Sequence, residues 1–76
     1  MTKLKKVRES TGLSQSQFAN KADISLRMLQ SYEQGERSID GAKIKTLLQI
    51  AKTAKCKLSD IIEDETLQLE LREYNL

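Results

Sequence analysis

One face of one expected helix carries the side chains best suited to chemistry. Between Ser25 and Gly35 that face holds hydrogen-bonding groups and one positive charge but no acid: Leu26, Arg27, Gln30, Ser31 and Gln34. An ordinary solvated helix face would mix Glu with Lys. Guanidinium, amide and hydroxyl groups match the donors, acceptors and thymine methyls that base pairs expose in the major groove of DNA. The pattern therefore indicates a surface that reads bases.

The residues of this face suggest separate roles. Arg27 suits a bidentate contact to guanine, which contributes about 1–3 kcal/mol of discrimination, and Leu26 suits a thymine methyl. Gln30 and Ser31 are further candidates for base reading. Ser25 and Gln34, at the two ends of the helix, are assigned to phosphate. A solvated face remains the alternative for each polar residue.

Two short helices joined by a tight turn must position this face. Ser14 is expected to cap the first helix in a capping box with Gln17. Asp23-Ile24-Ser25 interrupts the period, Ser25 caps the second helix, and Gly35 ends it in a left-handed conformation. The expected inward residues are Phe18, Ala19, Ala22, Ile24, Leu29 and Tyr32.

Several segments together resemble a known family. Gly12-Leu13-Ser14-Gln15, Phe18-Ala19, Ile24-Ser25 and Tyr32-Glu33-Gln34-Gly35 match, in order and spacing, the lambda repressor-like, Cro-type (XRE) helix-turn-helix family. The resemblance covers roughly residues 3–63. It implies an all-α fold, a compact five-helix domain with the helix-turn-helix at helices two and three.

The resemblance also implies roles for residues outside the second of these helices. Gln15, Arg37 and Ser38 are phosphate contacts by resemblance, and Arg8 pairs with Glu33 to tie the first helix to the third. The loop that holds Arg37 and Ser38 departs from the family, because it lacks a Pro and is followed by a few extra residues. Those residues either lengthen the fourth helix at its start or enlarge the loop.

The remaining helices of the domain are expected at residues 3–11, 40–54 and 58–63. Asp40 would cap the fourth helix, and Lys55 would end it where the family usually has Gly or Asn. Cys56 is expected to be buried and structural. Leu58, Ile61 and Ile62 would close the core. The fourth helix carries an apolar stripe of Ile44, Leu47, Leu48, Ala51 and Ala54.

Residues 64–76 form a C-terminal extension beyond the DNA-binding domain of residues 1–63. Leu67, Leu69 and Leu71 alternate with polar residues, which favours a strand, whereas Leu67, Leu71 and Tyr74 also fit one helical stripe. A lone strand is unstable, so we expect it to pair with its copy in a homodimer. Leu67, Leu69, Leu71 and Tyr74 are the expected dimerisation residues.

Composition limits the classes of function. The 76 residues contain no Pro, three Gly, one Cys and no His, which favours an all-helical chain without a cofactor or a metal site. No nucleophile motif or phosphate-binding Gly loop is present, so an enzyme is not expected. No apolar run suits a leader or a membrane span, and a cytoplasmic protein is expected.

Charge is distributed unevenly along the chain. Residues 1–57 hold twelve basic and five acidic residues, whereas residues 58–76 hold one and six. A basic body indicates a polyanion such as double-stranded DNA. The sequence therefore predicts a transcriptional regulator, by default a repressor that binds a palindromic operator as a homodimer. The alternative is an antitoxin whose acidic tail binds a protein toxin, and co-purification of a second small protein would distinguish the two.

Overall fold

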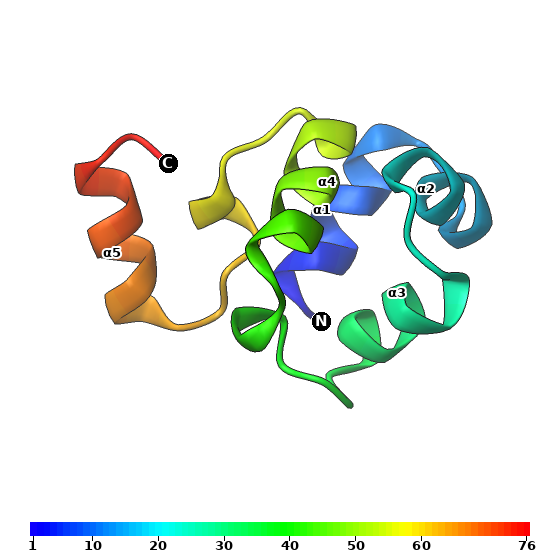
Figure 1. Ribbon diagram of the computed structural model, residues 1–76, viewed down its shortest axis with the longest axis horizontal. Coiled ribbons are helices and arrows are strands. Elements are labelled where there is room, and N and C mark those ends of the chain that lie inside the picture. Colours follow the sequence, from blue (N-terminus) through cyan, green and yellow to red (C-terminus); the bar gives the residue numbers. More distant parts are fainter.

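The computed structural model describes all residues 1–76 and contains only helices (Figure 1). Helices α1 to α4 surround one core, and α5 lies at the opposite end of the molecule from α2 and α3. The all-α prediction is confirmed. The elements in chain order are α1 (Lys3–Thr11), α2 (Gln15–Ala22), α3 (Leu26–Gln34), the 3-10 turn η1 (Ile39–Gly41), α4 (Ile44–Ala54), the 3-10 turn η2 (Leu58–Asp60) and α5 (Glu65–Glu73).

The core takes a fully buried side chain from each of the first four helices. These are Leu4, Phe18, Leu29 and Ile50, and Ile61 joins them from the segment after η2. A truncation such as Leu29→Ala would cost about 2–5 kcal/mol, because the cavity adds to the lost burial. The core therefore fixes α3 through its inner face.

Helix α4 begins later than the sequence indicates. The prediction that it starts at residue 40 with Asp40 as its cap is wrong, because Asp40 lies in η1 and α4 starts at Ile44 after Lys43. The carboxylate of Asp40 instead accepts from the backbone N–H groups of Glu63 (2.8 Å) and Asp64 (2.9 Å). The extra residues therefore enlarge the loop.

The apolar stripe expected on α4 is only partly buried. Leu47 and Ala51 are buried and Ala54 packs against the core, but Ile44 and Leu48 are exposed. The α4 terminus follows the prediction, since Lys55 adopts the left-handed conformation at φ 55°. That conformation costs a non-Gly residue on the order of 1 kcal/mol.

The predicted helix at residues 58–63 is wrong in type and length. Only Leu58–Asp60 is helical, as a single 3-10 turn. Ile61 and Ile62 are nevertheless buried as expected, and Leu58 packs against the core from a half-buried position.

The preference for a C-terminal strand is also wrong. Asp64 caps α5 by accepting from the N–H of Leu67, and Leu71 packs against the core. The Gln68 side chain donates to the carbonyl of Ile62 at 2.7 Å, and Leu76 returns to accept from the Ser59 N–H at 3.1 Å. These contacts within the chain stabilise the tail as a helix, so it needs no second strand to pair with. No helix is long and apolar enough to cross a membrane.

Candidate nucleic-acid interface

Local hydrogen bonds set the geometry of α2, the turn and α3. Both bonds of the predicted capping box are present: Ser14 Oγ accepts from the Gln17 N–H, and Gln17 Oε1 accepts from the Ser14 N–H. Asp23 ends α2 at φ 58°, and Ser25 Oγ accepts from the Met28 N–H at 3.0 Å. The two helices are therefore joined by a short, fully capped turn.

Helix α3 turns one face inward and leaves the other accessible. Leu29 and Tyr32 are buried, as predicted, and Ile24 of the turn packs against the core. On the opposite face Leu26, Arg27 and Gln34 are exposed, whereas Gln30 and Ser31 are half-buried. The structure thus places all five residues of the proposed base-reading surface on the accessible side of α3. We call this set, Leu26, Arg27, Gln30, Ser31 and Gln34, the reading face.

A buried ion pair holds α3 against α1. Arg8 Nε donates to Glu33 Oε2 at 2.7 Å and Arg8 Nη2 donates to Glu33 Oε1 at 3.1 Å, as the family resemblance implies. The side chains are 10% and 1% exposed. The hydrogen bonds that Arg8 donates to the Glu33 carboxylate raise the pKa of Arg8 above its ordinary value. Arg8 also donates to the carbonyl of Leu13 at 3.0 Å, which links the pair to the start of α2.

Two glutamines extend this network to the reading face. Gln15 Nε2 donates to Glu33 Oε1 at 3.0 Å, and Gln30 Nε2 donates to Gln15 Oε1 at 3.3 Å. A carboxylate only accepts, so Glu33 fixes the amide of Gln15, and that amide in turn fixes the amide of Gln30. The sequence did not reveal this chain of contacts, because residues 15, 30 and 33 meet only through the packing of α2 on α3.

The loop after α3 brings a second arginine to the reading face. The N–H groups of Glu36 and Arg37 donate to the carbonyl of Ser31 at 3.0 and 3.3 Å. A shallow hollow of about 90 Å³ results on the α3 surface, lined by Ser25, Arg27, Met28, Ser31 and Arg37. Arg27 and Arg37 therefore line the same hollow. Ser38 follows in an exposed position before η1.

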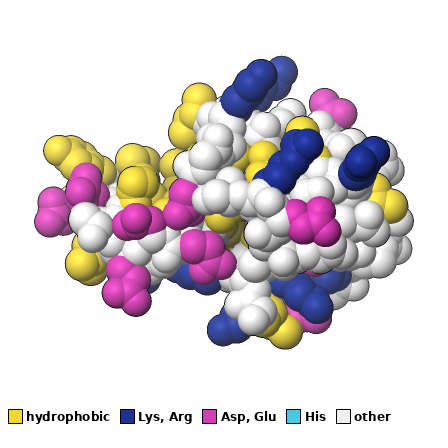
Figure 2. Space-filling model, turned by 90° about the horizontal axis from the view of Figure 1, so that it is seen from below, with side chains coloured by type: hydrophobic (Ala, Val, Ile, Leu, Met, Phe, Trp, Pro, Cys, Tyr) yellow, Lys and Arg dark blue, Asp and Glu magenta, His cyan; other side chains and the backbone are white.

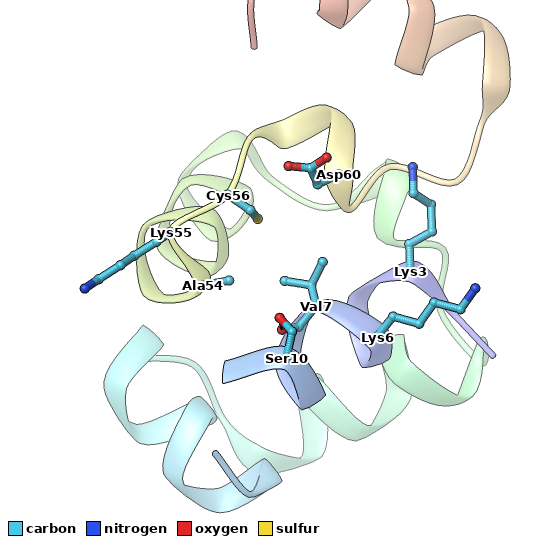
Figure 3. Close-up of a pocket in the computed structure, with 8 residues that line it drawn as sticks. All are labelled: Lys3, Lys6, Val7, Ser10, Ala54, Lys55, Cys56 and Asp60. Atoms are coloured by element: carbon cyan, nitrogen blue, oxygen red, sulfur yellow. Dashed lines mark hydrogen bonds between the residues drawn. The ribbon is translucent and has the colours of Figure 1, made fainter. Parts of the chain in front are cut away.

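A larger cleft of about 400 Å³ lies between α1 and the end of α4 (Figure 3). Its lysines do not converge, since Lys6 and Lys55 point away from it and Lys3 Nζ donates to the carbonyl of Ser59 at 2.9 Å. Cys56 is half-buried there. Burial, with a smaller contribution from the charge of Asp60, raises the pKa of its thiol, which disfavours the reactive thiolate. No group of acidic or Cys residues could hold a metal ion.

The fold and the accessible face of α3 define a helix-turn-helix DNA-binding domain. A model of the helix-turn-helix family HTH_3, which comprises lambda repressor-like, XRE-type regulators, matches residues 4–61. The chain belongs to this family, and it is a DNA-binding transcription regulator of the XRE type. Comparisons with curated proteins and with solved structures gave no match.

Proposed function

We propose that this protein represses transcription by binding a palindromic operator as a homodimer, with α3 in the major groove and α2 across it. The observation that carries the proposal is the accessible, acid-free face of α3, held rigidly from behind by the buried Arg8–Glu33 pair. A helix held in this way meets base edges without first losing conformational freedom.

The base contacts follow from the chemistry and position of each side chain. Arg27 is exposed beside the α3 hollow and suits the two acceptors of guanine, while Leu26 suits a thymine methyl. Gln30 gives one N–H to Gln15 and keeps Oε1 and its second N–H free, which is the donor and acceptor set that adenine requires. Ser31 lies one helical turn after Arg27 and lines the same hollow, where its hydroxyl could contact either purine.

The phosphate contacts surround this face. Ser25, Gln34, Arg37 and Ser38 lie at the ends of α3 and in the following loop, where the DNA backbone would pass. Gln15 lies at the first position of α2, whose N-terminus favours an anion. Since its side chain is engaged by Glu33 and Gln30, its phosphate contact would use the backbone N–H or the remaining side-chain N–H.

A homodimer is proposed because one helix reads only a few base pairs. Two copies on half-sites about one helical turn apart would convert weak half-site binding into specific operator binding. Leu67 and Leu69 of α5 and Tyr74 just after it are exposed and available for the second copy, whereas Leu71 packs against the chain's own core. Occupation of an operator beside a promoter would block polymerase.

The test is selection of bound sites from a random pool of duplex DNA. The proposal expects a two-fold symmetric site with half-sites about one helical turn apart. Selection of a single asymmetric half-site would refute the dimeric operator, and failure to enrich any sequence would refute sequence-specific reading. A reporter gene placed behind the selected site then tests the regulatory sign, with lower expression expected when the protein is present.

A further inference from the structure

Exposed apolar side chains lie on α4, on α5 and on the C-terminal residues that follow α5. Ile44 is 62% exposed, Leu69 60% and Tyr74 77%, and Leu48, Leu67 and Leu76 are also exposed. Elsewhere only Met1 and Leu26 are large, apolar and exposed, and Leu26 belongs to the reading face. Apolar side chains that cluster on one end of a small domain mark an interaction surface, whereas scattered ones do not.

A cleft between the end of α4 and the C-terminal residues forms the centre of this surface. Its volume is about 350 Å³ and its floor is apolar, made of Leu48, Ala51, Leu58 and Leu76. Ile44 lies one helical turn before Leu48 and extends the apolar strip along α4. We call the surface made by Ile44, Leu48, Ala51, Leu58 and Leu76 the α4 cleft.

The rim of the α4 cleft is basic. Lys52, Lys55 and Lys57 line it. Lys57 Nζ already donates to Asn75 Oδ1, but Lys52 and Lys55 have no acidic partner, because Arg8–Glu33 is the only ion pair of the chain. An apolar floor with free ammonium groups at its edge fits an apolar segment flanked by carboxylates.

Helix α5 offers such a segment. Leu69 and Glu73 are four residues apart on its exposed side, and Glu70 lies next to them. Neither glutamate forms an ion pair within the chain. Figure 2 shows a group of acidic side chains at one end of the molecule together with apolar ones, while the basic side chains and some further acidic ones lie over the rest of the visible face.

We propose that the occupant of the α4 cleft is α5 of a second copy of this chain. The inference rests on the homodimer of the proposed function and specifies its interface. The cleft and the complementary helix are on the same chain. In a two-fold symmetric dimer the contact would therefore occur twice, with α5 of each copy packed on α4 of the other. Leu69 would cover the apolar floor, and Glu70 and Glu73 would pair with Lys52 and Lys55.

The first test measures the mass of the full-length protein by sedimentation equilibrium without DNA. The wild type should be dimeric, and both Leu69→Glu and Leu48→Glu should raise the dimer dissociation constant at least about thirtyfold, because symmetry places each new charge in the interface twice. Leu26→Glu is the matched control: it places the same charge on an exposed leucine of α3 and should remain dimeric. A monomeric wild type, or a Leu69→Glu variant that is still dimeric, overturns the proposal.

The second test exchanges the charges. One variant carries Lys52→Glu and Lys55→Glu, and the other carries Glu70→Lys and Glu73→Lys. In a dimer of either variant alone, the cleft rim would face a tail of the same charge at both contacts. Each variant should therefore be monomeric by itself. Mixed in equal amounts, they would form a heterodimer, because each rim then faces a tail of opposite charge. Circular dichroism checks that each variant is helical on its own.

The outcomes separate this interface from the proposed function. Self-association of either charge variant, or failure of the mixed variants to pair, overturns the reciprocal contact between α4 and α5. Because no DNA is present, a dimer with this behaviour supports the interface even if site selection shows no specific DNA binding. A symmetric operator combined with a dimer that Leu69→Glu leaves intact would retain the regulator and refute this interface.

Discussion

Replacing Arg8 by Met should destabilise the protein strongly. The substitution keeps most of the side-chain length but leaves the Glu33 carboxylate, which is 1% exposed, with only the Gln15 amide as a hydrogen-bond donor. Removing one partner of a buried ion pair typically costs about 3–5 kcal/mol, because the other charge stays buried and uncompensated. A domain of this size has a total stability of about 5–15 kcal/mol, so a large part of it would be lost.

The assay is equilibrium denaturation in urea followed by circular dichroism. The midpoint should fall sharply while the slope stays constant, since the native contacts elsewhere are unchanged. The matched control is the double variant Arg8→Met with Glu33→Leu, which replaces both charges by apolar groups and should recover most of the loss. A cost below about 1 kcal/mol for Arg8→Met would show that the pair behaves like a solvated one and would refute its role in holding α3.

The remaining predictions concern DNA binding, the loop and the thiol. Arg27→Ala should relax base preference at one position of each half-site, whereas Arg37→Ala should weaken all sequences alike, as measured on a panel of single-base site variants. Raising the salt concentration should lower the affinity steeply, and a flat response would contradict phosphate contacts by the basic body. Asp40→Ala should lower the urea midpoint by the equivalent of about 1–3 kcal/mol, because two N–H groups lose their acceptor; unchanged stability would show that water replaces it. Alkylation of Cys56 should require higher pH in the folded chain than in urea. Since folding favours the neutral thiol, the thiol's contribution to stability, measured against Cys56→Ala, is present at low pH and lost as pH rises through the raised pKa.

The parts of the fold that short-range rules determine were predictable from the sequence. The capping box at Ser14, the Ser25 cap and the left-handed Gly35 all depend on residues within one turn of each other, and all are present. The Arg8–Glu33 pair joins distant residues, and it was predictable only because the spacing of both residues matched a family pattern.

The errors fall where contacts between distant segments decide the local structure. The 65–73 segment fits a strand and a helix almost equally by period, and the helix is selected by the bond of Gln68 to the Ile62 carbonyl and by the packing of Leu71 against the core. Asp40 is a sound cap by local rules, yet its carboxylate is taken by the N–H groups of Glu63 and Asp64. The link between Gln15 and Gln30 was missed for the same reason, since only the packing of α2 on α3 joins them.

The central claim is that the outer face of α3 reads bases in the major groove. The most direct measurement replaces the guanine that Arg27 is proposed to read, in the selected site, by 7-deazaguanine, which lacks only the N7 acceptor. Wild-type binding should lose about 1–3 kcal/mol, or roughly 5- to 150-fold in affinity, whereas Arg27→Ala should lose nothing further. Equal losses for the two proteins, or no loss for the wild type, would contradict major-groove reading by α3.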